Sequence, residues 1–144
     1  MKVKDVMTHE VECVRPEATL QEAATKMKSL DVGPIPVCEG DRVMGILTDR
    51  DIVVRGVAEG RDCRTTRVQD VMTREVVTAN DDDDVEDVAR LMKQHQIRRI
   101  VVVNRDKRLA GIVSMKDLAV DTGDEKMAGQ VLEKVSEDAL VEKR

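Results

Sequence analysis

The feature that most constrains the fold of this chain is that it contains almost the same sequence twice. The segment 3–8, V-K-D-V-M-T, is matched 65 residues later by the segment 68–73, V-Q-D-V-M-T. The match continues through Glu10-Val11 and Glu75-Val76. Such self-similarity within 144 residues predicts two structural units of the same kind.

Each copy contains an apolar stripe at helical spacing. The stripes are Leu20, Ala23, Ala24 and Met27 in the first copy, and Val85, Val88, Ala89 and Met92 in the second. The spacing i, i+3, i+4, i+7 predicts an amphipathic helix with one buried face. Thr19 with Glu22 predicts a capping box at the start of the first helix, and Asp84 with Asp87 predicts a weaker cap at the second.

Short apolar segments rich in β-branched residues follow each predicted helix. They cover 35–38 and 43–47 in the first copy and 100–103 and 109–113 in the second, and each pair predicts a β-hairpin. Thr48 and Ser114 then begin second helices. Each copy therefore predicts the order strand, helix, strand, strand, helix, which is an α+β unit.

The repeat divides the chain into 1–60, 61–122 and a tail, 123–144. The polar segment 56–67 carries two glycines and predicts the linker between the copies. In the tail, a helix is predicted to present Met127, Val131, Leu132 and Val135 on one side. This helix either packs on its own unit or serves as an arm that binds a partner.

Composition excludes several classes of protein. The longest apolar run is four residues, far short of the roughly 20 that a membrane span needs. The formal charge of −5 and the absence of Phe, Tyr and Trp argue against binding to nucleic acid, which usually stacks on aromatic rings. We therefore expect a cytoplasmic protein without a membrane segment or a nucleic-acid partner.

The metal-binding and redox residue types are sparse. They are Cys13, Cys38, Cys63, His9 and His95, and the cysteines form no C-x-x-C motif. This spacing predicts neither a disulfide framework nor a zinc site, and reduced structural thiols are expected.

An acidic run, Asp81–Asp84, precedes the second predicted helix. Four adjacent carboxylates can form a metal site or an acidic-ligand cluster. They can also interact favourably with the helix dipole and the free N–H groups of the first turn, which is the interpretation we favour.

Taken together, the motifs resemble those of the CBS domain family. In the first copy they are V-x-D-V-M-T, then V-x-P-x-A-T-L-x-E-A-A-x-x-M over 14–27, V-G-x-I-P-V over 32–37 and G-I-L-T-D-R-D-I over 45–52; the second copy ends in G-I-V-S-M-K-D-L over 111–118. The resemblance covers residues 1 to about 121 and implies a stand-alone tandem pair, or Bateman module. Such a pair consists of two β-α-β-β-α units packed about a pseudo-two-fold axis, here with a C-terminal helical tail. Family members commonly dimerise and bind AMP, ADP, ATP or S-adenosylmethionine in clefts between the units.

The pattern G-h-h-[ST]-x-x-D, where h is apolar, occurs at Thr48 with Asp51 and at Ser114 with Asp117. A strand that ends at a helix N-terminus favours a phosphate, and the carboxylate can accept hydrogen bonds from ribose hydroxyls. The same residues are also ordinary helix caps that need no ligand. The family resemblance favours ribose binding, and a cap does not exclude it.

The two copies offer different charges to a phosphate. The second copy has Arg98 and Arg99 before its hairpin and Lys116 in the helix-opening turn, whereas the first has Gly33, Pro34 and Arg50 at the matching positions. The cleft with Ser114 and Asp117 is therefore the preferred one, and the cleft with Thr48, Arg50 and Asp51 is the weaker one. Family geometry implies that the adenine of the preferred cleft lies near Val11, Glu12, Cys13, Val32, Gly33 and Pro34. Arg98 and Arg99 are alternatively a solvated or dimer-facing pair.

These expectations describe a non-catalytic regulatory sensor that binds an adenine nucleotide, AMP, ADP or ATP. No cofactor is required, no metal site is expected, and no catalytic constellation is present. The expected partners are a second copy of the chain and an unidentified regulated protein. The alternatives are a structural interaction module with unoccupied clefts and a CBS pair that binds S-adenosylmethionine.

Overall fold

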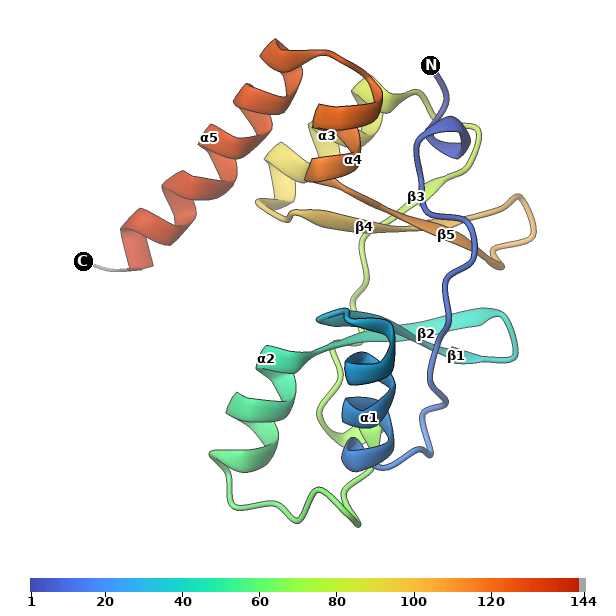
Figure 1. Cartoon of the computed structure of the whole chain (residues 1–144), viewed down its shortest axis with the longest axis vertical. Helices are drawn as coiled ribbons and strands as arrows, with labels where there is room; N and C mark the ends of the chain where they lie inside the picture. The colour runs from blue at the N-terminus through green and yellow to red at the C-terminus, as the bar shows by residue number, and fades with distance from the viewer. Residues whose placement is uncertain (143–144) are drawn as a thin grey trace. The chain divides into compact units, whose positions relative to one another are not determined.

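A computed structural model describes the backbone of residues 1–142 and the side chains of residues 1–137. The chain forms two compact units (Figure 1). Unit 1 combines Met1–Val11 with the chain from Val77 onward, and unit 2 is Glu12–Val76. Each unit contains both strands and helices, so the predicted α+β class is confirmed.

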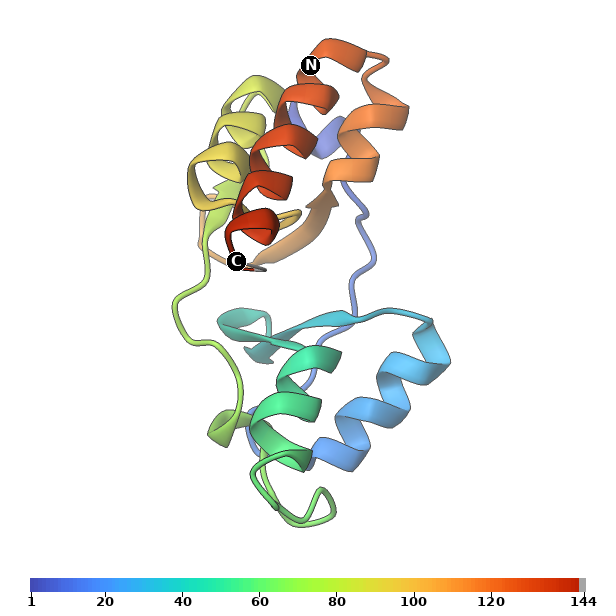
Figure 2. The same cartoon turned by 90° about the vertical axis from the view of Figure 1, so that its left-hand side faces the viewer.

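Unit 1 is a three-stranded sheet with helices on one side. Its elements are the 3-10 helix η1 (Val3–Asp5), β3 (Thr78–Asn80), α3 (Val85–His95), β4 (Arg99–Val103), β5 (Leu109–Ser114), α4 (Met115–Asp121) and α5 (Glu125–Glu142). Strand β4 is central, parallel to β3 and antiparallel to β5. Helix α5 packs against both α3 and α4, as Figure 2 shows. The core beneath them is aliphatic and includes Val88, Met92, Ile100 and Leu118.

Unit 2 repeats this plan with a smaller sheet. Its elements are α1 (Leu20–Leu30), β1 (Pro34–Glu39), β2 (Arg42–Thr48), α2 (Asp49–Asp51), the π-helical turn η2 (Ile52–Val57) and the 3-10 helix η3 (Val68–Asp70). Strands β1 and β2 are antiparallel. The first strand expected in this copy is reduced to one parallel bridge between Val14 and Val37. The helix continues through Val57, two residues into the segment predicted as linker.

The repeated V-x-D-V-M-T segments each complete the unit built mainly from the other copy. Thr8 pairs with Ile112 of β5, with N···O distances of 2.8 and 3.1 Å. Thr73 pairs with Ile46 of β2 in the same way, and both distances are 2.9 Å. Each compact unit therefore combines the first residues of one repeat with the remainder of the other repeat. The boundaries at 60/61 and 122/123, which follow the repeat, remain a prediction.

Two glycines make this pairing possible. A Cβ atom at Gly111 would lie 2.5 Å from the Thr8 carbonyl oxygen and 2.8 Å from the Met7 sulfur. At Gly45 it would lie 2.7 Å from the Thr73 carbonyl oxygen. Non-bonded atoms cannot approach so closely, so the glycine in each G-h-h-[ST]-x-x-D motif is required by the backbone that docks against it.

The two predicted helix caps have different outcomes. Thr19 and Glu22 form the expected capping box at α1, with the Glu22 N–H donating to Thr19 Oγ1 at 3.1 Å. The cap predicted from Asp84 and Asp87 at α3 is wrong, because the Asp84 side chain caps no backbone N–H. Its carboxylate instead pairs with Lys2 Nζ at 3.1 Å.

The acidic run before α3 holds the N-terminal segment in place. Lys4 Nζ lies 3.1 Å from Asp82 Oδ1, and the Asn80 N–H donates to Asp83 Oδ2 at 2.9 Å. The hydrogen bond and charge of Lys4 lower the pKa of the Asp82 carboxyl. Among the residues whose side chains are described, no three or more His, Cys, Asp or Glu residues gather closely enough to hold a metal ion.

The tail helix packs on its own unit. Met127, Val131 and Val135 of α5 are buried in the core of unit 1, which confirms the first of the two alternatives. The prediction for Leu132 is wrong, since this side chain is 49% exposed. Residues 143–144 of the predicted tail lie outside the described residues. None of the described helices combines the length and the apolar character that a membrane span requires.

Replacing Gly111 by Ala tests the close approach of segment 3–8 to β5. We expect Gly111→Ala to lower the free energy of unfolding by about 1–3 kcal/mol, because the backbone must shift to relieve the overlap. Gly129→Ala in α5 is the matched control, since nothing lies within 4 Å of a Cβ atom there. In an exposed helical position this change should stabilise by about 0.5–1 kcal/mol. Calorimetric melting of both variants checks the contrast, and equal effects would contradict it.

Candidate functional site

The candidate ligand-binding residues form one cluster in each unit. The unit 1 site consists of Arg98, Arg99, Ser114, Lys116 and Asp117, and the unit 2 site of Gly33, Pro34, Thr48, Arg50 and Asp51. In both units, the first residue of the hairpin pairs with the last residue of its second strand. These pairs are Arg99 with Ser114 and Pro34 with Thr48. The structure therefore brings together the residues of each motif that the sequence separates by about 15 positions.

One backbone hydrogen bond places the residue before each hairpin beside the start of the following helix. In unit 1 the Met115 N–H donates to the Arg98 carbonyl oxygen at 2.8 Å. In unit 2 the Asp49 N–H donates to the Gly33 carbonyl oxygen at 3.1 Å. Residue 98 or 33 consequently lies beside the helix-opening turn of its unit.

Both helix-opening turns are closed by reciprocal capping boxes. The Ser114 N–H donates to Asp117 Oδ2 at 2.8 Å, and the Asp117 N–H donates to Ser114 Oγ at 3.1 Å. Thr48 and Asp51 repeat this arrangement at 2.9 and 3.0 Å. Within the described part of the chain, Oδ1 of each aspartate has no hydrogen-bond donor. Each partly buried carboxylate thus caps its helix with one oxygen and keeps the other for a further contact.

The unit 1 site has an excess of positive charge. Arg98, Arg99 and Lys116 are all exposed, and none has an ion-pair partner among the residues whose side chains are described. The single carboxylate of the cluster, Asp117, is engaged by the Ser114 N–H. Cations that no protein carboxylate neutralises can form charge-assisted hydrogen bonds to an external anion.

The unit 2 site has the opposite balance, and one of its residues escaped the sequence analysis. The Asp49 carboxylate covers Gly33, since a Cβ atom there would lie 3.1 Å from Asp49 Oδ1. Asp49 Oδ1 also accepts a hydrogen bond from the Arg50 N–H at 3.0 Å. Aligning T-D-R-D with S-M-K-D could have identified Asp49, because Met115 occupies its place in unit 1. Two carboxylates and one cation make this site less suited to a phosphate.

The other candidate residues lie at the edges of their units. Val11 belongs to unit 1, whereas Glu12 and Cys13 begin unit 2. Lys26 fixes the latter two, with its Nζ 3.6 Å from Glu12 Oε1 and 3.0 Å from the Cys13 carbonyl oxygen. Val32 follows α1 and is 41% exposed. It is thus available for an apolar contact.

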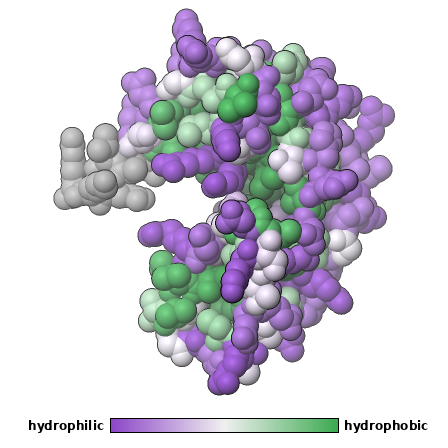
Figure 3. Space-filling view, viewed as in Figure 1, coloured by the Kyte–Doolittle hydropathy of each residue, from purple (hydrophilic) through white to green (hydrophobic). Residues whose placement is uncertain are grey.

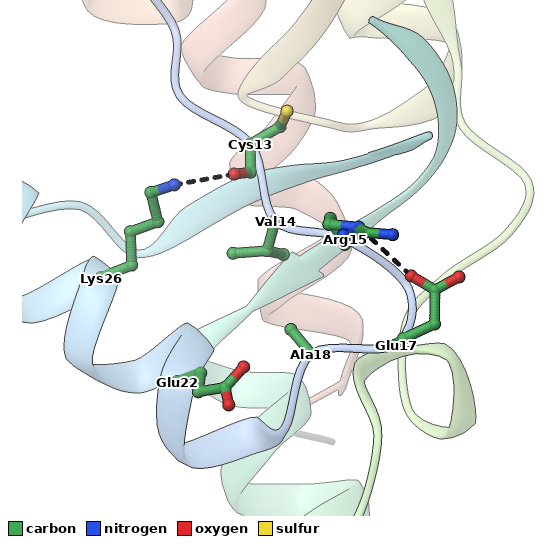
Figure 4. A pocket seen from close by; sticks show the side chains of 7 residues that line it. All are labelled: Cys13, Val14, Arg15, Glu17, Ala18, Glu22 and Lys26. Atoms are coloured by element: carbon green, nitrogen blue, oxygen red, sulfur yellow. Dashed lines mark hydrogen bonds and ion pairs between the residues drawn. The ribbon is translucent and has the colours of Figure 1, made fainter. Parts of the chain in front are cut away.

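A pocket of about 400 Å³ lies next to this segment (Figure 4). Its lining residues are Cys13, Val14, Arg15, Glu17, Ala18, Glu22 and Lys26. Arg15 Nε and Glu17 Oε2 form an ion pair of 3.5 Å across one edge. The lining thus contains both positively and negatively charged side chains, and Arg15 and Glu17 are already paired with each other.

Comparison with known proteins gives a consistent result. The family model "CBS domain" matches residues 3–56 and 68–120. The CBS domain-containing protein YhcV of Bacillus subtilis is 47% identical over 134 residues, which cover 93% of this chain and 94% of YhcV.

Two solved structures share the fold. Hypoxic Response Protein I, determined with two coordinated zinc ions, has a TM-score of 0.75 and 35% identity, covering 83% of this chain and 97% of that one. The CBS domain pair of protein MJ0100, in complex with 5′-methylthioadenosine and S-adenosyl-L-methionine, has a TM-score of 0.73 and 27% identity over the same shares.

Substitution of Asp117 tests whether the capping box contributes to stability without a ligand. Asp117→Ala removes the acceptor of the Ser114 N–H, and we expect the free energy of unfolding to fall by about 0.5–2 kcal/mol. Asp117→Asn retains an acceptor oxygen and should lose less. Calorimetric melting of the ligand-free proteins measures both. An unchanged stability of Asp117→Ala would show that the cap contributes nothing.

Proposed function

The chain belongs to the CBS domain family as a tandem pair, and from this membership we propose that it is a non-catalytic sensor of an adenine nucleotide. The proposed ligands are AMP, ADP and ATP, and no cofactor is required. Outside the two matched segments and the stretches that join them, the described part of the chain adds only helix α5, which packs on unit 1. The proposed partners are a second copy of the chain and an unidentified regulated protein.

The observation that carries this proposal is the set of three cations in the unit 1 site that form no ion pair with any side chain of residues 1–137. Arg98, Arg99 and Lys116 supply the donors that a phosphate group needs. Asp117 Oδ1 is the proposed acceptor for ribose hydroxyls, because Oδ2 is already used by the cap. Val11, Glu12, Cys13, Val32, Gly33 and Pro34 are the proposed contacts of the base, which aliphatic side chains and backbone groups would bind in this protein without aromatic residues.

The unit 2 site is proposed to discriminate against phosphates. Asp49 and Asp51 repel an anion, and only Arg50 attracts one. Thr48 and Asp51 can still bind a ribose through the free carboxylate oxygen. This site is therefore proposed either to remain empty or to take a less anionic adenosine compound. S-adenosylmethionine, which the MJ0100 pair binds, is the alternative ligand of this kind.

Calorimetric melting with separately added ligands tests the proposal. A nucleotide at about 100 times its dissociation constant stabilises the folded protein by roughly 2.7 kcal/mol, which raises the melting temperature by several degrees. We expect this rise with AMP, ADP or ATP for the wild type and a much smaller rise for Lys116→Ala. Arg50→Ala is the matched control, since Arg50 occupies the equivalent position in unit 2, and it should respond as the wild type does.

Three outcomes would contradict the proposal in different ways. If no adenosine compound changes the melting temperature, the capped helix ends have only a structural role, and the protein is an interaction module. If S-adenosylmethionine alone raises it, the ligand class is wrong. If Arg50→Ala loses the effect and Lys116→Ala keeps it, the preferred site is wrong.

We also propose that the protein assembles as a homodimer through the second helix of each repeat. Val54 and Val120 occupy the same position in the two repeats and are 44% and 69% exposed. Val53 and Val57 extend the exposed apolar surface of the α2–η2 segment, which is visible in Figure 3. Exposed aliphatic groups at equivalent positions suit a self-complementary contact with a second copy.

Sedimentation velocity tests the dimer. We expect the wild type to sediment as a dimer at micromolar concentration and Val54→Asp to shift towards the monomer, because a charge would be buried in the contact. Leu132→Asp, at a half-exposed position of α5, is the control and should stay dimeric. A monomeric wild type, or a dimeric Val54→Asp, would contradict the proposal.

A further inference from the structure

Two cysteines that are 25 residues apart in sequence lie together in unit 2. The Val14 N–H donates to the Pro36 carbonyl oxygen at 3.0 Å, and the Cys38 N–H donates to the Val14 carbonyl oxygen at 2.9 Å. These bonds bring the segment that contains Cys13 alongside β1, which contains Cys38. The spacing of the two cysteines in the sequence gives no sign of this parallel bridge.

Both thiols are on the same face of the bridge. Val14 and Val37 point into the core of unit 2. Because side chains alternate along extended segments, the preceding Cys13 and the following Cys38 point to the opposite face. Figure 4 shows Cys13 Sγ and the Val14 side chain on opposite sides of the segment. Cys13 Sγ lies 3.9 Å from the Gly40 carbonyl oxygen, beside the end of β1.

The environments of the two thiols differ. Cys38 is 1% exposed, whereas Cys13 is partly exposed at the rim of the pocket in Figure 4. Burial, together with the charge and side-chain hydrogen bond of the neighbouring Cys13, raises the pKa of the Cys38 thiol to about 12. Cys13 is therefore the thiol that an external reagent reaches first.

We propose that Cys13 and Cys38 are a modification site that forms an intramolecular disulfide when a low-molecular-weight disulfide or a similar oxidant is present. The Cys13 thiolate attacks one sulfur of the oxidant, forms a mixed disulfide and releases one thiolate. Cys38 then loses its proton and attacks the Cys13 sulfur, which releases the second thiolate. The two cysteines lose two electrons and two protons in total, and the oxidant is reduced to two thiols.

The bond would link the start of unit 2 to its sheet. Residue 12 is the first residue of unit 2, so Cys13 lies at the point where the chain enters it. The closed loop contains the whole of α1. Closing a loop of this length restricts the unfolded chain, so the oxidised protein should be the more stable form. Unit 1 has Thr78 and Val103 at the matching positions and cannot form the equivalent bond.

Peptide mapping tests the proposal without reference to any nucleotide. Trypsin places the three cysteines on separate peptides, 5–26, 29–42 and 62–64, because the Arg15–Pro16 bond resists cleavage. Reduced protein at low concentration is treated with oxidised glutathione, and free thiols are then alkylated. We expect peptides 5–26 and 29–42 to be linked and peptide 62–64 to be alkylated. Alkylation of Cys13 and Cys38 after oxidation, or a stable glutathione adduct on Cys13, would overturn the proposal.

Two variants separate the disulfide from general effects of oxidation. Oxidation should raise the melting temperature of the wild type and of Cys63→Ser by a few degrees. Cys13→Ser, at the partly exposed position, should fold normally and show no rise. A rise of equal size in Cys13→Ser, or its absence in Cys63→Ser, would contradict the assignment of the bond to this pair.

Discussion

The whole structure depends on main-chain pairing between each V-M-T segment and a glycine-containing strand of the other repeat. Thr8 pairs with Ile112 and Thr73 with Ile46, and a side chain at Gly111 or Gly45 would prevent either contact. Met7 and Met72, next to these threonines, fill the two cores. Neither unit is therefore complete without residues from the other copy of the repeat, and the compact units do not coincide with the repeats.

The same strands that receive the V-M-T segments end in the candidate sites. Each strand runs from its glycine into a Ser or Thr that caps a helix, so the pairing that anchors the strand also fixes the capping box. The geometry of the two sites is consequently almost identical. What differs is the charge of the exposed side chains, with Arg98, Arg99 and Lys116 in one unit against Asp49 and Arg50 in the other. The scaffold sets the positions, and the surface residues set the charge that each site presents.

Much of this could be predicted from the sequence, because local patterns determine it. The helical stripes, the hairpins and the Thr19–Glu22 cap depend on neighbouring residues and are present in the structure, except that Ala24 of the first stripe is exposed and not buried. The features that sequence analysis missed depend on contacts between distant segments. The Asp84 carboxylate pairs with Lys2 and does not cap α3. The bridge between Val14 and Val37 brings together two segments that each contain a cysteine and are far apart in the sequence. The contact of the Asp49 carboxylate with Gly33 could not be predicted without the positions of both backbone segments.

We propose above all that the unit 1 site binds the phosphate of an adenine nucleotide. Isothermal titration calorimetry with AMP and adenosine tests it most directly, because the two ligands share a base and a ribose and differ in the phosphate. We predict that AMP binds at least about tenfold more tightly, since hydrogen bonds to charged groups contribute about 1.5–3 kcal/mol. Added salt should reduce that advantage. Equal affinity for AMP and adenosine, or tighter binding of adenosine, would contradict the claim.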